Sequence, residues 1–365
     1  MLINIQFLRM IAAMLVVLYH TSSHVRASGI EQGSLFEVME AVGFAGVDIF
    51  FVISGFIMAH TSVDARGAGD GWAFLRRRMA RIYSGYWPFF LLALALFAWI
   101  DPSLMEKAKL LQSAILWPAY PLLIAVSWTL IFEMFFYLLF AVIICITDRR
   151  RSLFLVVLFG LMLLVAICNQ FVRHAYDPGH LETLSLAENL MLSPYLLEFL
   201  GGALLAGWLH RESNRQTTMN DRRWDIFLLA AGCVFFLLGG WINNRYFDGG
   251  IEQGYAVFYR VLAFGVPSLL ILAALVRLDQ KGRRAPLQFS LLTGGASYAI
   301  YLSHGLILAS MQKLGFNDYA GGLGAGVAQI LYLVLAALIL GYSVMHFRWI
   351  ERPLHRILKG WLRVS

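Results

Sequence analysis

The sequence predicts an all-α, polytopic membrane protein, on the evidence of its composition, its long apolar blocks and the distribution of its basic residues. Of its 365 residues, 59% are apolar and 14% are charged, whereas soluble domains contain about 45–50% apolar and about 25% charged residues. The apolar residues come in blocks of about twenty, and a helix of that length crosses about 30 Å of hydrocarbon. A membrane β-barrel would need segments of about ten residues with alternating polarity, and the sequence lacks them.

About ten apolar blocks are long enough to span the membrane. They are residues 3–22, 42–60, 83–100, 128–147, 152–170, 189–209, 225–243, 256–277, 291–311 and 323–347. If the N-terminus is cytoplasmic, the inner segments hold 21 of the 29 Lys and Arg residues and the outer segments hold seven. This asymmetry follows the positive-inside rule and predicts that both termini are cytoplasmic. The net charge of +7 therefore indicates topology, and we expect no nucleic-acid partner.

Residues 110–127 are apolar, but Pro118 and Pro121 interrupt them. An odd number of crossings must connect the outer residue 101 to the inner residue 148, so we expect 110–127 to be a re-entrant or interfacial segment. Broken backbone at membrane depth needs cover from protein or a cavity. We expect one transmembrane domain over residues 1–347 and a short basic cytoplasmic tail over 348–365.

The three cysteines fall within or at the ends of predicted spans, and we expect them to be apolar fillers without a disulfide framework. The first apolar run has its charge inside it and lacks a small-residue cleavage site, which argues against a cleavable signal.

A few ionisable side chains interrupt the apolar spans. Each costs at least about 2.5 kcal/mol on insertion scales, so each suggests a function. They are Arg9, His20, Asp48, Glu133, Glu198 and His304, with Arg260 near an outer end.

Arg9 and His20 are eleven residues apart in the first span. This spacing is about three helical turns, so the two side chains share a face and lie roughly 16 Å apart along it. A long substrate could lie along such a face. The alternatives are an arginine that reaches the inner headgroups and a hydrated histidine at the outer interface.

His20, Asp48 and Glu133 should all lie in the outer half of the bilayer, because of where each falls within its span. A histidine beside a carboxylate can act as a general base, since the carboxylate orients the ring and stabilises the imidazolium. Asp48 could instead only cap its helix, and His304, in the middle of its span, could be a buried structural histidine.

Arg77, Arg78 and Arg81 lie at the inner end of the third predicted span. Arg78 and Arg81 are one helical turn apart, and Arg77 is four residues before Arg81. Paired guanidinium groups suit a phosphate. Ordinary topology and contact with lipid headgroups would explain the same cluster.

These positions place cations at the inner face and a histidine with carboxylates near the outer face. The arrangement suits a transferase that takes a phosphorylated donor from inside and serves an acceptor outside. It would also suit a proton-coupled exporter, although the internal repeats expected of a transporter are not evident. A passive partner of a polysaccharide assembly system would leave Glu133 unexplained.

Six motifs in order resemble the acyltransferase 3 family of membrane acyltransferases, over about residues 3–353. They are Arg9 with His20, GVDIFFVISGF at 46–56, Arg78 with Arg81, SWTLIFEMFFY at 127–137, SYAIYLSH at 297–304 and IERP at 350–353. The opening NIQFLR and the GVDIFFVISGF motif are most similar to the exopolysaccharide-production subgroup of O-acetyltransferases.

The resemblance implies about ten helices and acyl transfer from a cytoplasmic acyl-CoA, usually acetyl-CoA, without a metal. It implies an acceptor hydroxyl on an extracytoplasmic or lipid-linked carbohydrate, and a bacterial inner membrane. It makes His20 the catalytic histidine with Arg9 as its partner, Glu133 the acidic partner, and Arg78 and Arg81 the ligands of the CoA phosphates. Further motif positions, with supportive roles, are Asp48, Ser127, Trp128, Tyr298 and His304.

The mechanism we expect begins with a CoA whose phosphates bind Arg78 and Arg81, with Arg77 nearby. Its pantetheine arm passes Arg9, which could instead grip a donor phosphate or the carbonyl. The thioester meets His20, which either deprotonates the acceptor hydroxyl or is itself acylated first. We also expect possible contacts with polysaccharide assembly proteins.

Overall fold

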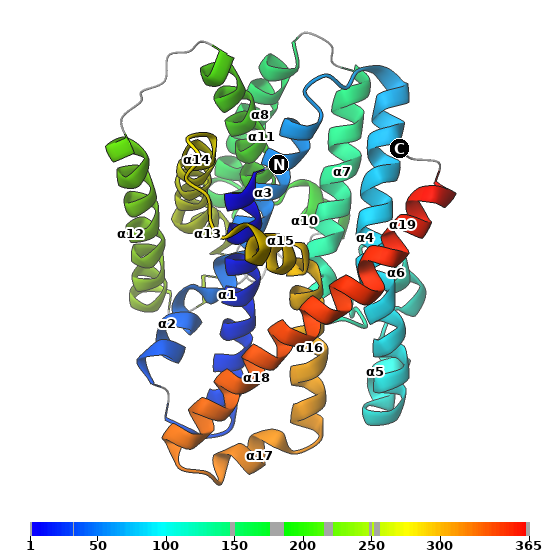
Figure 1. The fold of residues 1–365 in the computed structure, drawn as a ribbon, viewed down its shortest axis with the longest axis vertical. Helices are drawn as coiled ribbons and strands as arrows, with labels where there is room; N and C mark the ends of the chain where they lie inside the picture. Colours follow the sequence, from blue (N-terminus) through cyan, green and yellow to red (C-terminus); the bar gives the residue numbers. More distant parts are fainter. Residues whose placement is uncertain are drawn as a thin grey trace. The chain divides into compact units, whose positions relative to one another are not determined.

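A computed structural model describes residues 2–31, 33–146, 150–175, 186–214, 222–247, 250–251 and 256–362. These residues form helices and connecting loops, without a strand (Figure 1). Within them, nine helices are long and apolar enough to cross a membrane, or ten if the pair Leu287–Gly295 and Ser297–Lys313, bent by 50°, is one span. The predicted all-α membrane fold is confirmed. Residue 147 of the fourth predicted span and three predicted inner basic residues, Arg149, Arg215 and Arg363, lie outside the described part.

The chain divides into two compact units. The first unit comprises Met1–Arg9, Val47–Leu75 and Phe132–Leu287. Its helices are α3 (Gly46–Thr61), α7 (Trp128–Ile146), α8 (Arg151–Phe171), α10 (Leu186–Met191), α11 (Tyr195–Asn214), α12 (Arg222–Tyr246), α13 (Val257–Arg260), η4 (Val261–Gly265) and α14 (Val266–Gln280). It also includes the first residues of α1 (Ile3–Ala27) and of α4 (Gly67–Ile100), whereas Gly46 of α3 and residues 128–131 of α7 belong to the second unit.

The second unit comprises Met10–Gly46, Arg76–Ile131 and Gln288–Ser365. It holds most of α1 and α4. Its other elements are α2 (Ser34–Val42), η1 (Gly43–Ala45), α5 (Pro102–Lys107), α6 (Leu110–Ala114), η2 (Ala125–Ser127), α15 (Leu287–Gly295), α16 (Ser297–Lys313), α17 (Phe316–Gly321), α18 (Ala325–His346), η5 (Phe347–Glu351) and α19 (Arg352–Trp361). Within this unit α16 packs against α18 (Figure 1).

In the first unit, α3 and α11 cross in backbone contact. A Cβ added at Gly55 would lie 1.8 Å from the Phe199 carbonyl oxygen, and one at Gly202 would lie 2.1 Å from the Val52 carbonyl oxygen. Small residues permit this approach, as they do in other membrane helix pairs. The crossing holds Asp48 on α3 and Glu198 on α11 in the same part of the unit.

The predicted break at residues 110–127 is confirmed as a short helix followed by irregular backbone. Three side chains of α4 hydrogen-bond its carbonyls: Tyr86 to Ser113 at 2.8 Å, Tyr83 to Ile115 at 2.8 Å and Trp87 to Ala114 at 3.1 Å. These donors tie the end of the short helix and the residue after it to α4, and they help to satisfy the polar backbone there. Whether the segment enters the membrane stays a prediction.

Two short π-helical segments, η4 and η5, each lie just before a proline, Pro267 or Pro353. Val266 N–H donates to Val261 O, and Arg352 N–H donates to Phe347 O, five residues back in each case. A proline ring clashes with the carbonyl four residues earlier, and a π-bulge accommodates this strain and recurs at functional sites. Arg260 directly precedes η4, and Glu351 ends η5.

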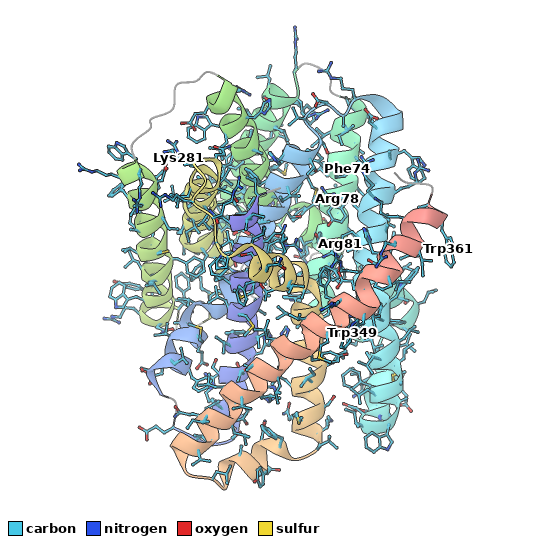
Figure 2. The ribbon with its side chains drawn as sticks, in the orientation of Figure 1. Phe74, Arg78, Arg81, Lys281, Trp349 and Trp361 are labelled. Atoms are coloured by element: carbon cyan, nitrogen blue, oxygen red, sulfur yellow. The ribbon has the colours of Figure 1, made fainter. Side chains whose placement is uncertain are left out.

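The predicted spans match the observed helices, but two are much longer than expected. α4 begins at Gly67 instead of residue 83, so Arg77, Arg78 and Arg81 are helical (Figure 2). The last span continues through η5 and α19 as one helix to Trp361, so the described part of the predicted tail is helical. The single domain over 1–347 stays a prediction.

Candidate functional site

His20 and His304 lie side by side in the second unit. Nδ1 of His20 is 3.3 Å from Nε2 of His304, and the ring centroids are 4.9 Å apart. His304 is fully buried, while His20 is half-buried. The GVDIFFVISGF motif begins at Gly46, where a Cβ would lie 2.2 Å from the Ala12 carbonyl oxygen, so η1 packs tightly on the helix that carries His20.

Backbone carbonyl oxygens beside His20 and His304 determine which ring nitrogens carry hydrogen. Nδ1 of His20 is 2.9 Å from Val16 O, and Nδ1 of His304 is 3.3 Å from Ile300 O. A carbonyl oxygen only accepts, so both Nδ1 atoms carry hydrogen. Nε2 of His304 then accepts from Nδ1 of His20, and Nε2 of the neutral His20 ring holds the lone pair. This tautomer leaves His20 with the nitrogen that a base or nucleophile needs.

Tyr301 connects His304 to the SWTL motif. The Tyr301 ring is edge-on to His304, with centroids 5.7 Å apart. Its hydroxyl donates to Val126 O at 3.1 Å and accepts from Thr129 Oγ1 at 3.1 Å. Between these two partners lie Ser127, which is buried and donates to Ile124 O at 2.7 Å, and the half-buried Trp128. The SWTL motif therefore helps to hold the Tyr301 ring that lies beside His304.

Arg81 is engaged by an acidic residue that the sequence did not single out. Its guanidinium donates to the carboxylate of Glu351, which is fully buried, and to Gly295 O at 3.3 Å. The guanidinium carbon is 5.9 Å from the Tyr298 ring centroid, and a Cβ at Gly85 would lie 2.4 Å from that ring. Glu351 belongs to the IERP motif. Its position as a lone acidic residue within a basic segment is the feature of the sequence that could have identified it as a partner of an arginine.

Arg78 is half-buried and Arg77 is exposed on the same helix. Figure 2 shows Arg78 and Arg81 one turn apart along α4. The predicted spacing is therefore confirmed as helical. The role of the three arginines at phosphates stays a prediction, and Arg81 would have to bind phosphate while it is paired with Glu351.

Asp48 lies in the first unit, where both carboxylate oxygens face Arg260. Arg260 Nε is 3.1 Å from each oxygen, and Nη2 is 2.7 Å from Oδ2. The two residues are 0% and 3% exposed, and the Arg260 guanidinium carbon is 5.2 Å from the Tyr195 ring centroid. Asp48 therefore forms a buried ion pair with Arg260, whereas the sequence also allowed a simple helix cap.

Glu133 and Arg9 also belong to the first unit. The half-buried Glu133 accepts a hydrogen bond from the Tyr137 hydroxyl on α7, and Arg9 Nη1 is 3.3 Å from Gln6 Oε1 on α1. His20 is in the other unit, so its predicted pairing with Glu133 stays a prediction. Arg9 and His20 do occupy one unbroken helix, as the eleven-residue spacing requires.

The structure therefore brings together His20 with His304, and Arg81 with Tyr298, in the second unit. It holds Asp48, Glu133 and Arg9 in the first. Sequence reasoning noticed Arg260 and Glu198 as intramembrane charges without assigning them a role, and it missed Glu351.

Comparisons with known proteins find a family model and curated relatives. A family model described as "Acyltransferase domain" matches residues 2–346. The exopolysaccharide production protein ExoZ of Rhizobium meliloti (strain 1021) is 29% identical over 328 residues, which cover 86% of this chain and 90% of that protein. The acyltransferase MdmB of Streptomyces mycarofaciens is 27% identical over 381 residues, with 96% and 91% covered. No solved structure matches the chain.

Proposed function

The chain belongs to the acyltransferase 3 family, and we propose on that premise that it moves an acetyl group from cytoplasmic acetyl-CoA to a carbohydrate hydroxyl. The acceptor is an extracytoplasmic or lipid-linked polysaccharide, and the protein works in the bacterial inner membrane. The family supports acyl transfer, and the similarity to an exopolysaccharide production protein supports a carbohydrate acceptor. The charge asymmetry of the segments supports two cytoplasmic termini.

The contact between His20 and His304 carries the proposal. Because Val16 O and His304 Nε2 both receive Nδ1–H of His20, the neutral ring has its lone pair at Nε2. His304 is a positioning residue, since it acts only through His20. Such hydrogen bonds to a catalytic imidazole fix its tautomer and its orientation.

The chemistry follows from that tautomer. Nε2 of His20 takes the proton of the acceptor hydroxyl while the oxygen attacks the thioester carbonyl. The tetrahedral intermediate collapses, the carbon–sulfur bond breaks, and the imidazolium returns the proton to the CoA thiolate. The products are an ester and CoA thiol, with no net proton released. In the second route Nε2 attacks the thioester first and displaces the CoA thiolate. The sugar hydroxyl then takes the acyl group from the histidine, and the hydroxyl proton passes to the thiolate.

Arg78, Arg81 and Arg77 are the proposed ligands of the CoA phosphates, with Arg9 available to a phosphate or to the thioester carbonyl. Glu133 and Asp48 stay proposed partners of the reaction, and Trp128, Ser127 and Tyr298 supporting residues. Guanidinium groups bind phosphate oxygens through charge-assisted hydrogen bonds, which supports the α4 cluster as the donor site.

The test is CoA release by the purified protein in nanodiscs, with labelled acetyl-CoA and an acceptor polysaccharide. We expect His20→Ala to lower the rate by a factor of about 10² to 10⁴, the contribution of general acid–base catalysis. The matched control is His210→Ala, since His210 is an exposed histidine on α11. Unchanged acetylation by His20→Ala would refute the role of His20. Label on the protein without acceptor would favour the acyl-histidine route.

A proton-coupled exporter of a lipid-linked sugar is the second candidate, because the first unit buries Asp48, Glu198 and Arg260 together. An exporter would move the sugar without consuming acetyl-CoA. The same assay separates the two: CoA release that depends on His20 favours the transferase, and transport without CoA release favours the exporter.

A further inference from the structure

Buried carboxylates in the described part of the chain are held by cations, with one exception. The held ones are Asp48 with Arg260, Asp225 with Arg277 and Lys281, Asp279 with Arg284, and Glu351 with Arg81. Glu198 is equally buried, at 2% exposure. Neither of its side-chain oxygens receives a hydrogen bond from an N–H or O–H group.

The neighbours of Glu198 explain this exception. Its carboxyl lies within hydrogen-bonding reach of Asp48, and Arg260 directs Nε and Nη2 to Asp48. On the remaining side is the backbone of Gly265, where an added Cβ would lie 2.6 Å from Glu198 Oε1. The crossing of α3 and α11 at Gly55 holds the two carboxyls together.

Two carboxylates in contact cannot both stay ionised beside one guanidinium at such burial. Like charges at this separation oppose each other's ionisation, and an uncompensated charge among apolar helices is costly. One added proton removes both costs, because a protonated carboxyl donates a hydrogen bond to the other carboxylate. The pair with Arg260 is then electrically neutral, with one proton, one negative charge and one positive charge.

We propose that Asp48 and Glu198 together bind one proton, and that they form a proton-binding site inside the membrane-spanning part of the protein. The proton comes from water, and Glu198 carries it while Asp48 accepts the hydrogen bond and keeps its pairing with Arg260. The protonation of this pair can be tested without the acyl transfer proposed at His20.

The groups that face the site come from each helix packed on it. They are Asp48 from α3, Glu198 and Tyr195 from α11, and Arg260 from α13. If the proton leaves, the one positive charge of Arg260 faces the two negative charges of Asp48 and Glu198. Arg260 directly precedes the π-helical η4, and Gly265 ends that segment against Glu198.

The test is infrared spectroscopy of the full-length protein in nanodiscs near neutral pH. We expect the carbonyl stretch of one protonated carboxylic acid in the wild type and its loss in Glu198→Gln. The glutamine amide has the shape of the protonated acid, so this variant should fold. The matched control is Asp225→Asn, another buried carboxyl, which Arg277 and Lys281 hold; it should keep the band.

A wild-type spectrum without such a band, or a band that Glu198→Gln retains, would overturn the proposal. If Glu198→Gln fails to fold, wild-type protein labelled with ¹³C-glutamate gives the answer. A band that moves with the label supports the site, and a band that stays fixed or is absent refutes it. CoA release is not needed in either experiment, so failure of the proposed acyl transfer would leave the result unaffected.

Discussion

Arg81 is paired with the buried Glu351, and the same side chain is a proposed ligand of the CoA phosphates. The pairing is asymmetric, because the Arg81 side chain is 26% exposed and that of Glu351 is 0% exposed. A phosphate could therefore approach the open side of the guanidinium while Glu351 holds the other. Structural and donor-binding roles can be separated by changing the two residues singly and together.

Arg81→Gln should lower the free energy of unfolding by about 3 kcal/mol, since it leaves a buried carboxylate without its partner. The double variant Arg81→Gln with Glu351→Gln should recover most of that loss, because no buried charge remains. Thermal denaturation in nanodiscs measures both.

The double variant also tests donor binding. A hydrogen bond to a charged group contributes about 1.5–3 kcal/mol, or roughly tenfold in affinity or more. We therefore expect the KM for acetyl-CoA to stay raised about tenfold in the stable double variant. A KM equal to that of the wild type would leave Arg81 with a structural role alone.

His304→Ala should lower kcat about 10- to 100-fold, the usual effect of removing a partner that orients a functional imidazole. The KM for acetyl-CoA should stay unchanged, because His304 contacts His20 and not the proposed phosphate ligands. His346→Ala is the control: His346 is also buried, and it stacks on Phe89 with ring centroids 4.3 Å apart. Equal losses in both variants, or a change confined to KM, would contradict the positioning role.

The sequence identified most of these residues but not their partners. His20 and His304 were both candidates, yet 284 positions separate them, as 212 separate Asp48 from Arg260 and 270 separate Arg81 from Glu351. Hydropathy and helical spacing report neighbours within one helix. They contain no information on which helices pack together, so these contacts could not be predicted.

At the scale of the element, apolar block length predicted the nine spans of the described residues, and the remaining predicted block, 291–311, falls on the bent helix pair Leu287–Gly295 and Ser297–Lys313. Prolines predicted the break at 110–127. The early start of α4 was missed because its basic residues precede the apolar block that set the predicted bounds, although their helical spacing was noted. They remain compatible with a helix because Phe74 and Ile82 on the same segment are buried while Arg77 is exposed. An amphipathic helix end outside the hydrocarbon has too little hydropathy to be detected as a span.

The crossing of α3 and α11 should tolerate no side chain at its centre. Gly55→Ala should prevent accumulation of folded protein, because its Cβ would lie 1.8 Å from a backbone oxygen that cannot move alone. Gly160→Ala on α8 is the control, since nothing lies within 4 Å of its Cβ, and helix propensity favours alanine there by about 1 kcal/mol. Size-exclusion chromatography of solubilised protein compares them, and normal yield of Gly55→Ala would contradict the close crossing.

At the scale of the whole molecule, the Lys and Arg residues of the connecting segments predict an orientation in the membrane that the helices alone do not determine. The same set of described helices could be inserted in either orientation, and only the Lys and Arg asymmetry distinguishes the two. The two compact units likewise could not be predicted, because each gathers segments from distant parts of the chain.

Reporter fusions test the orientation. Fluorescent protein fused after Ser365 should fluoresce and alkaline phosphatase fused there should be inactive, because the C-terminus is expected to be cytoplasmic. Fusions after Ser103, between the third and fourth spans, should give the opposite pattern. The reverse result at both positions would refute the predicted topology, and with it the cytoplasmic access of CoA to Arg78 and Arg81.

The helix from Ala325 to Trp361 is longer than any bilayer needs. Its 37 residues extend about 55 Å at 1.5 Å per residue, against about 30 Å of hydrocarbon. Even the largest usual tilt, about 40°, leaves roughly 12 Å of overhang. One end of this helix carries Arg356 and Lys359 and the exposed Trp361, which Figure 2 labels. This basic and aromatic composition is suited to headgroups. The overhanging end would then anchor the final helix among the headgroups and limit its movement along the membrane normal.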